Sequence, residues 1–302
     1  MRKFILNCLL FILPGMILFG WFEMRVRQFK NVTSQRVEAL SEPASPIEVL
    51  VLGNSHSGDG VDPRQFDMHT YNIAQGSQSL YFDIEITKKY LDNLSSLKYV
   101  LISMDYHSLY FTHSEVRDFM YSHYYGIRYK DQGFDRSDIS LSLYGYGLET
   151  RWGMMNREPL QATRGWWGSH KKTLTEKLTA KKAQQRVQSF DKMIEKNKDE
   201  RLYYLNKLND FIVELKSRNV TPVFLTLPGH NYYVQALDSS SAARNASDVE
   251  SLCKKHDLTH FNFINDIGLP DTIFYNVDHL NRTGAVLYSQ KINEALNALE
   301  QH

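Results

Sequence analysis

The residues best suited to chemistry are a serine near the start of the chain and a histidine near its end. Ser55 follows the run Ile47-Glu-Val-Leu-Val-Leu-Gly-Asn, in which apolar residues give way to a small-residue turn. His279 lies in Asp278-His-Leu-Asn281, just before a last amphipathic stretch. A hydroxyl with an imidazole base within reach is the arrangement that acyl transfer requires. Taken singly, Ser55 could be only a helix N-cap and His279 only a packed histidine.

The elements that must position these residues alternate between strands and helices. We predict strands at 47–52, 71–74, 98–104, 220–227 and 260–264, and helices at 80–94, 200–218, 242–256 and 283–299. Such alternation predicts an α/β three-layer sandwich, with a five-stranded parallel sheet covered on both faces. Ligands bind outside the carboxyl ends of the strands in such sheets, and Ser55 follows one of those ends.

Three short blocks resemble those of the SGNH/GDSL hydrolase superfamily, in particular its membrane-anchored branch associated with bacterial surface polysaccharides. The blocks are Gly53-Asn-Ser-His56, Asn72-Ile-Ala-Gln-Gly76-Ser-Gln78 and Asp278-His-Leu-Asn281. The resemblance implies a flavodoxin-like SGNH fold with Ser55 as the nucleophile and His279 as the base. It also implies an oxyanion hole formed by the backbone amides of Ser55 and Gly76.

The chain departs from the family pattern at the acid that orients the histidine. The family acid stands three residues before the histidine, where this chain has Asn276, and Asp278 is adjacent to His279 instead. Either residue could orient the base. Because neighbouring side chains of an extended loop diverge, we expect Asn276 to face His279 and Asp278 to turn toward solvent or a cap. The family's third-block asparagine is also missing after the strand 98–104, and Asp105 and His107 are candidates for its polar role.

The segment 105–199 interrupts the strand–helix rhythm and is rich in tyrosine and tryptophan. We interpret it as an insertion, and long insertions are often binding elements. Its aromatic side chains could stack on sugar rings, or could simply fill the core of a small subdomain. Candidate substrate contacts, in the insertion and near the serine, are His56, Gln78, Asp105, His107, Trp166 and Trp167. His56 and Gln78 could instead lie behind the catalytic residues and support them.

The N-terminus predicts a membrane anchor. The uncharged run from Phe4 to Phe22 is long enough to span a bilayer. A cleaved signal peptide is the alternative, but the run ends in bulky aromatic residues rather than small ones. We expect an anchor at 1–22, a polar tether at 23–46 and an SGNH-like domain at 47–302. Basic residues flank the run on both sides, so the charges leave its orientation open. The resemblance implies a single-pass protein of the bacterial inner (cytoplasmic) membrane, its globular domain facing the periplasm or the cell exterior.

Composition narrows the choice of partners. A net charge of +1 gives no reason to expect nucleic acid as a partner. The basic stretch 170–186 is explained by a solvated helix face, or by contact with an anionic glycan or lipid headgroup. Cys8 and Cys253 are too differently placed to form a bridge, and no cysteine/histidine cluster has metal-ligand spacing. We therefore expect no metal or other cofactor.

The sequence favours an enzyme but leaves a second class open. The leading hypothesis is an extracytoplasmic serine esterase or O-acyltransferase that acts on ester groups, O-acetyl above all, of a surface polysaccharide. The alternative is a non-catalytic SGNH-like module that binds glycan or assembles with other cell-envelope proteins. The asparagine at 276 and the missing third-block asparagine support the alternative.

Overall fold

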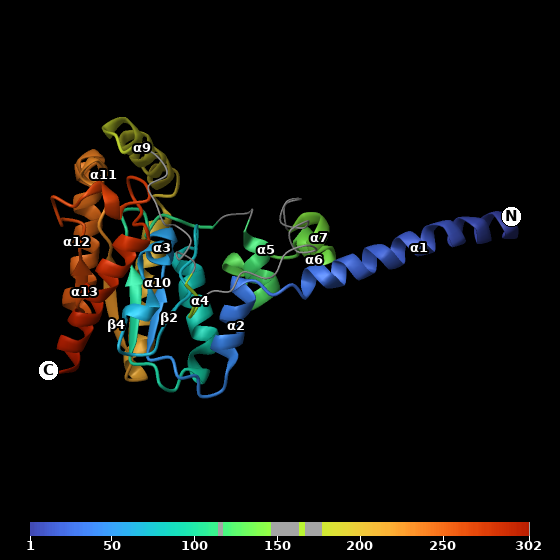
Figure 1. Ribbon diagram of the computed structural model, residues 1–302, viewed down its shortest axis with the longest axis horizontal. Coiled ribbons are helices and arrows are strands. Elements are labelled where there is room, and N and C mark those ends of the chain that lie inside the picture. The colour runs from blue at the N-terminus through green and yellow to red at the C-terminus, as the bar shows by residue number, and fades with distance from the viewer. Residues whose placement is uncertain (114–116, 146–162, 167–176, 302) are drawn as a thin grey trace. The chain divides into compact units, whose positions relative to one another are not determined.

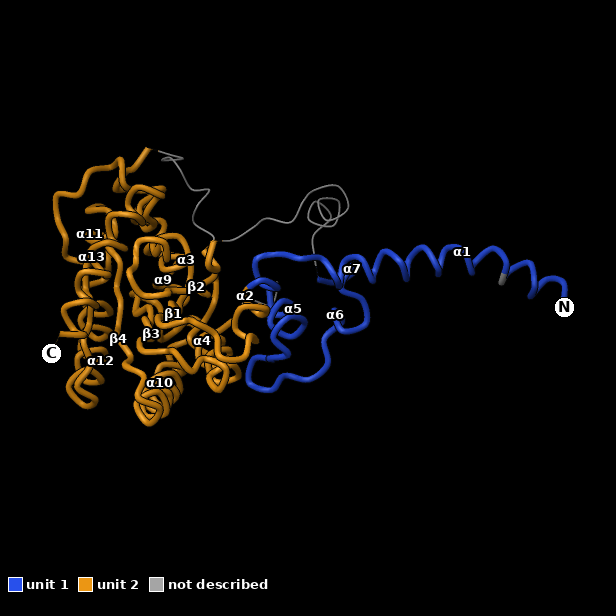
Figure 2. The backbone as a smooth tube through the Cα atoms, turned by 60° about the horizontal axis from the view of Figure 1, so that its bottom comes forward, with its two compact units in different colours: residues 1–35, 115–161 blue, residues 36–114, 162–302 orange. Residues whose placement is uncertain are grey.

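The computed structural model describes residues 1–113, 117–145, 163–166 and 177–301 (Figure 1). The chain divides into two compact units, which are described separately. Unit 1 comprises residues 1–35 and 115–161, and unit 2 comprises residues 36–114 and 162–302 (Figure 2).

Unit 2 is built on a parallel sheet of five strands. The strands are β1 (Val49–Leu52), β2 (Thr70–Asn72), β3 (Tyr99–Ser103), β4 (Thr221–Thr226) and β5 (His260–Asn262). Their order is β2-β1-β3-β4-β5, and every neighbouring pair is parallel. The side chains of β1 and β3 are fully buried, because helices cover both faces of the sheet. The predicted α/β fold with a five-stranded parallel sheet is confirmed, and the strand order is the flavodoxin-like one.

The main helices of unit 2 alternate with the strands in sequence, the last one following β5, and they frame the sheet (Figure 1). They are α3 (Ser55–Gly60), α4 (Leu80–Tyr90), α9 (Ala180–Lys196), α10 (Glu200–Ser217), α11 (Asn231–Ala236), α12 (Ser239–His256) and α13 (Arg282–Glu300). α10 packs on α4 and α12, whereas α13 packs on α3, so the helices form two layers. α12 starts earlier than predicted, because the Asp238 side chain accepts a hydrogen bond from Ser241 N at 2.9 Å and caps the helix.

The segment predicted as a polar tether contains regular structure. α1 (Arg2–Arg27) continues past the apolar run, and α2 (Val32–Ser41) follows it. Within α2, the side chains of Arg36 and Leu40 are buried. Asn31 Oδ1 accepts a hydrogen bond from Ser34 N at 2.9 Å and supports the start of this helix. The interpretation of 23–46 as a simple spacer is therefore wrong for this stretch.

Unit 1 combines α1 with short helices drawn from the predicted insertion. These are α5 (Asp118–Met120), the π-helical turn η3 (Tyr121–Tyr125), η4 (Tyr129–Asp131), α6 (Arg136–Ile139) and α7 (Leu141–Tyr144). Val26, Phe119 and Leu141 form a small apolar core in this unit. α1 is long and apolar enough to cross a membrane. The predicted insertion is thus divided, since residues 163–166 and α9 belong to unit 2.

Candidate active site

Ser55 and His279 are 224 residues apart in the chain and in direct contact in the structure. His279 Nε2 lies 2.8 Å from Ser55 Oγ. Ser55 is the first residue of α3, immediately after the end of β1, and Asn54 caps that helix by accepting a hydrogen bond from His56 N. Gly53, between strand and helix, has a φ of +131°, which only glycine adopts readily. The sharp turn thereby presents the Ser55 hydroxyl at the carboxyl edge of the sheet.

A tight loop before α13 fixes the position of His279. Tyr275 N donates to His279 O at 2.9 Å, and Asn281 N donates to Ile273 O at 2.9 Å. The Asn281 side chain in turn caps α13 by accepting hydrogen bonds from Thr283 N and Gly284 N. The block Asp278–Asn281 therefore has two parts. Its loop positions His279, and its last residue, Asn281, caps α13.

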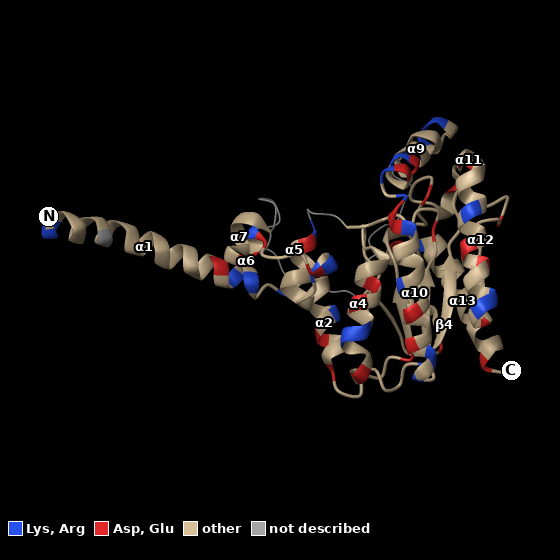
Figure 3. Cartoon of the chain, turned by 180° about the vertical axis from the view of Figure 1, so that it is seen from behind, with Lys and Arg blue, Asp and Glu red and all other residues tan. Residues whose placement is uncertain are grey.

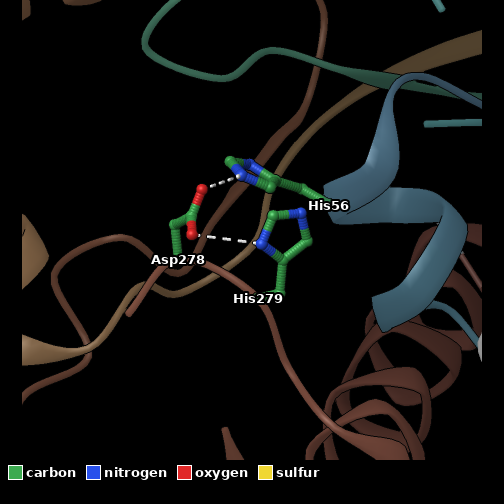
Figure 4. Close-up of side chains that lie close together, drawn as sticks. All are labelled: His56, Asp278 and His279. Atoms are coloured by element: carbon green, nitrogen blue, oxygen red, sulfur yellow. Dashed lines mark hydrogen bonds and ion pairs between the residues drawn. The ribbon is translucent and has the colours of Figure 1, made fainter. Parts of the chain in front are cut away.

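Asn276 and Asp278 both reach the second nitrogen of His279. Asn276 Oδ1 lies 3.0 Å from His279 Nδ1 in hydrogen-bond geometry, and it also accepts from the backbone amides of Asp278 and His279. Asp278 Oδ1 lies 3.1 Å from the same nitrogen, at ion-pair distance (Figure 4). Because the amide oxygen can only accept, Nδ1 carries the proton and Nε2 is left to accept from Ser55.

The expectation that Asp278 turns toward solvent or a cap is wrong. Its side chain is buried and points at two imidazoles, those of His279 and His56 (Figure 4). The expectation that Asn276 faces His279 agrees with the structure. The two residues divide the task, since Asn276 holds the ring by a hydrogen bond and Asp278 places a negative charge beside it.

His56 lies between two carboxylates. Its Nδ1 is 3.0 Å from Asp105 Oδ1, and its Nε2 is 3.3 Å from Asp278 Oδ2. Burial disfavours the charged ring, but the two carboxylates outweigh it and raise the pKa of His56 to about 10. His56 is therefore a buried imidazolium that links Asp105 to Asp278. His56 thereby positions Asp278, and its contact with substrate stays a prediction.

Arg186 adds a second cation to Asp278. Its Nε donates to Asp278 Oδ2 at 2.6 Å, and it reaches the site from α9, inside the predicted insertion. Burial alone would raise the pKa of Asp278, but His279 and His56 hold it well below its usual value. Asp278 is thus a carboxylate at neutral pH. Arg186 is not among the residues predicted for the site, and only its place in the basic stretch 170–186 pointed to it.

His279 has the character of a general base. Burial lowers its pKa from the ordinary value, the charge of Asp278 acts in the opposite direction, and the His56 cation lowers it further. The ring is therefore neutral at pH 7 and able to take a proton from Ser55.

Asp105 and His107 extend the network below His56. Asn54 Nδ2 donates to Asp105 Oδ2 at 2.7 Å and lies 3.3 Å from His107 Nε2. Burial opposes ionisation of Asp105, yet His56 and His107 lower its pKa below the ordinary range. His107 stacks on the Phe190 ring at 4.1 Å, and burial together with the His56 charge lowers its pKa to about 3. Both residues are buried and belong to this network, and their contact with substrate stays a prediction.

Gln78 supports the nucleophile turn from behind. It is buried and donates to Asp83 Oδ1 at 2.6 Å, and the same carboxylate oxygen accepts from Gly53 N at 2.9 Å. Burial is the main reason that the pKa of Asp83 rises to about 7. The role predicted for Gln78, contact with substrate, is replaced by a structural one.

The loop that carries Gly76 runs beside the Ser55 turn. Gln75 N donates to Gly53 O at 3.0 Å, one residue before Gly76. The buried Arg36 side chain braces this loop by donating to Ala74 O at 2.8 Å and to Gln75 Oε1 at 3.1 Å. Gly76 therefore lies near the nucleophile, and its role in an oxyanion hole stays a prediction. Arg36 fell within the predicted tether, so its function was missed.

Trp166 does not meet the expectation of a glycan contact. Only 1% of its surface is exposed, its Nε1 donates to Asp59 O at 3.4 Å, and the Arg64 guanidinium lies over its ring at 4.9 Å. It fills the core of unit 2, the alternative that the sequence left open for the aromatic residues. Trp167 lies outside the described residues.

A cavity of about 120 Å³ adjoins the network on the side of β3, β4 and β5. His56, Asp105 and Asp278 form its polar end, and its walls include Leu109, Tyr233 and Val249. Ser55 and His279 do not line it. The cavity therefore lies behind the acid side of the site and not over the nucleophile.

The same side chains could in principle bind a metal ion. Ligand atoms of His56, Asp278 and His279 all lie within 4.8 Å of one another. However, Arg186 already occupies one oxygen of Asp278, and a cation at that position opposes the binding of another. The hydrogen bond between His56 and Asp278 and the ion pair between Asp278 and His279 account for the cluster without a metal.

Comparison with known proteins finds similarity only among solved structures. No protein-family model matches the chain, and no curated protein matches it. A solved structure of a candidate acylhydrolase from Bacteroides fragilis NCTC 9343 is similar with a TM-score of 0.43 and 12% identity, over 88% of this chain and 94% of that one. A GDSL-like lipase from Bacteroides thetaiotaomicron VPI-5482 is similar with a TM-score of 0.44 and 10% identity, over 91% of this chain and 99% of that one. Likeness at this level carries no argument about activity, which depends on the geometry of the site.

Proposed function

We propose that this protein is a membrane-anchored SGNH-type serine esterase or O-acyltransferase. The observation that carries the proposal is the 2.8 Å contact between His279 Nε2 and Ser55 Oγ, with Asn276 and Asp278 at the other ring nitrogen. Serine acyl transfer needs a nucleophile in contact with a base, and a base in contact with an orienting group. Ser55, His279 and the pair Asn276 and Asp278 meet these requirements.

The chemistry follows from this order of contacts. Ser55 Oγ attacks the carbonyl carbon of an ester while His279 Nε2 takes its proton. The amide of Ser55 and that of Gly76 would stabilise the resulting oxyanion, an effect worth several kcal/mol in serine enzymes. His279 then returns the proton to the leaving alcohol, and an acyl group remains on Ser55. Water or a sugar hydroxyl, activated by the same base, takes the acyl group in the second step.

The unusual orienting pair is compatible with this chemistry. As the imidazolium forms, Asn276 keeps the ring in place and Asp278 supplies the charge that an asparagine lacks. Asp278 is itself held by His56 and Arg186, so its charge is fixed and does not have to reorganise during the reaction. The departure from the family pattern thus leaves a carboxylate in contact with the base.

The substrate class is inferred from the resemblance of the sequence blocks and not from bound groups. We infer ester groups, O-acetyl in the first place, of a surface polysaccharide, with the protein held by α1 in the bacterial inner membrane and unit 2 on the periplasmic or outer side. Nucleic acid is not an expected partner, whereas other cell-envelope proteins are.

A serine-directed fluorophosphonate probe tests the catalytic claim. We expect covalent labelling of the full-length protein in detergent, and loss of labelling in Ser55→Ala. His279→Gln is the second variant, and it should label far more slowly while the serine is intact. Release of acetate from a generic acetyl ester, with and without a soluble oligosaccharide acceptor, separates esterase from transferase. An acceptor that gains an acetyl mass would show transfer.

A non-catalytic glycan-binding or assembly module is the second candidate. It is favoured by Asn276 at the position of the family acid, and by Asp105 and His107 being engaged with His56 and Asn54 at the third strand end. A wild-type protein that the probe does not label at any pH from 6 to 9, yet retains glycan on a column, would support this module and overturn the enzyme.

A further inference from the structure

Two short helices of unit 1 are fastened to the end of the apolar helix. The Glu23 carboxylate in α1 accepts hydrogen bonds from Leu141 N at 2.8 Å, from Ser142 N at 3.0 Å and from Ser140 Oγ at 2.9 Å. These are the groups that begin α7, so Glu23 caps that helix from outside. One turn later, Arg27 Nη2 donates to Asp138 O at 3.3 Å, at the end of α6.

The point of attachment coincides with the end of the predicted membrane span. The uncharged run ends at Phe22, and Glu23 is the next residue, only about 1.5 Å further along the helix axis. If α1 crosses a bilayer, the start of α7 must lie at the level where hydrocarbon gives way to headgroups. Trp21, half exposed at the same level, is the residue type that prefers this zone.

Large apolar side chains are exposed on the two attached helices and just before α6. We define the juxtamembrane patch as the following four residues, with exposed fractions of 73%, 66%, 52% and 53%: Phe134, Ile139, Leu143 and Tyr144. In the same small unit, Val26, Phe119 and Leu141 are buried and form its core. The side chains of the patch therefore take no part in the core of unit 1. Apolar side chains that stay exposed on a protein surface often mark a site of interaction.

We propose that the juxtamembrane patch inserts into the interfacial region of the bilayer, in the leaflet where α1 ends. α6 and α7 then form a second contact of the protein with lipid, lying in the membrane surface beside the span. We favour lipid as the binding partner of the patch because Glu23, the residue that follows the apolar run, binds the start of α7. Unit 1 also carries the exposed basic residues Arg25, Lys30 and Arg136, which suit anionic headgroups, and Figure 3 shows Lys and Arg in blue toward the end of α1. This inference rests on the proposed membrane anchoring.

A lipid-quenching experiment tests the proposal on the full-length protein. A Cys8→Ser, Cys253→Ser background receives Leu143→Cys, and the new thiol carries an environment-sensitive fluorophore. The protein is reconstituted in vesicles of phosphatidylglycerol and phosphatidylcholine, with and without brominated acyl chains. Leu202→Cys in unit 2 is the control, at a leucine that is 64% exposed against 52% for Leu143. A third sample keeps only the native Cys8 and reports on α1 itself.

The expected result is a blue-shifted emission at position 143 that brominated lipid quenches strongly, as it also quenches the label at Cys8. The label at 202 should keep its emission. Quenching at Cys8 without quenching at 143 would overturn the patch while leaving the anchor intact. A blue shift at 143 that brominated lipid does not quench would indicate contact with a second copy or another protein, and it would also overturn the proposal. Absence of quenching at both positions would reject the anchor together with the patch.

Discussion

Arg186 donates a 2.6 Å hydrogen bond to Asp278, from a helix of the predicted insertion to the loop that presents the base. The Asp278 side chain is almost fully buried, whereas that of Arg186 is 38% exposed. The contact makes α9 part of the site. It also means that the charge beside His279 depends on a residue that no sequence block includes.

Replacement of Arg186 should weaken catalysis without unfolding the protein. Arg186→Gln removes a charge-assisted hydrogen bond, and such bonds contribute about 1.5–3 kcal/mol. We expect kcat to fall about 10- to 100-fold. Arg186→Lys, which keeps the charge, should recover part of the rate. Steady-state hydrolysis of an acetyl ester measures both variants, and an unchanged kcat in Arg186→Gln would show that Asp278 is held without it.

Asp278 should matter more than Asn276 for the rate. Asp278→Asn removes the only carboxylate at ion-pair distance from His279 among the described residues, and we expect a loss of about 10²- to 10⁴-fold in kcat. Asn276→Asp keeps the acceptor of the two backbone amides and adds a charge, so it should preserve or raise the rate. The same ester assay compares the variants. A greater loss in Asn276→Asp than in Asp278→Asn would reverse the assignment.

The pH–rate profile should show an acid limb with its midpoint below the ordinary pKa of histidine. Burial lowers the pKa of His279, so kcat/KM should rise with pH and reach its plateau by about pH 7. Asp278 acts to raise this pKa, and Asp278→Asn should therefore shift the limb to still lower pH while lowering the plateau. Profiles between pH 4 and 9 measure the shift. An acid limb that moves to higher pH in Asp278→Asn would contradict the prediction that Asp278 raises the pKa of His279.

His56 should make stability depend on alkaline pH. Its folded pKa of about 10 lies above the ordinary 6.5, so the stabilisation is fully present below pH 6.5 and is lost as pH rises through 10. The Tm difference between wild type and His56→Gln should therefore shrink from pH 6 to pH 10.5. His256→Gln is a suitable control, because burial lowers the pKa of that histidine and no loss is expected in this window. A constant difference across the range would mean that His56 is neutral.

Arg36 should stabilise the loop that carries Gly76. Its guanidinium donates to Ala74 O and to Gly165 O, both at 2.8 Å, and to the Gln75 side chain. Arg36→Met leaves buried carbonyls without a donor, at about 1–3 kcal/mol each. We expect a lower midpoint in urea unfolding and reduced kcat in the folded protein. A variant with wild-type stability would show that water or a rearranged loop replaces the guanidinium.

Part of this protein could be predicted from local patterns alone. Apolar runs such as Val49–Leu52 ending in Gly53, and helices with one apolar face, determine a parallel α/β sheet because burial and backbone geometry act over a few residues. The same local logic located Ser55 at the end of the first strand and His279 in the loop before the last helix. An apolar stretch of sufficient length likewise identifies α1 without knowledge of the fold.

The roles of several side chains at the site could not be predicted from the sequence, because they depend on contacts between distant residues. Whether Asn276 or Asp278 faces His279 is set by a loop whose amides bind Asn276 while His56 and Arg186 draw Asp278 inward. His56, Asp105 and His107 were predicted at the site because they lie near sequence blocks, but only the packed chain shows that they are buried against one another. Arg36 and Trp166 show the same limit. The sequence does not reveal which carbonyl oxygens Arg36 will bind, or that Trp166 will pack in the core of unit 2. Tertiary structure decides these roles, because burial and pairing are properties of the assembled chain.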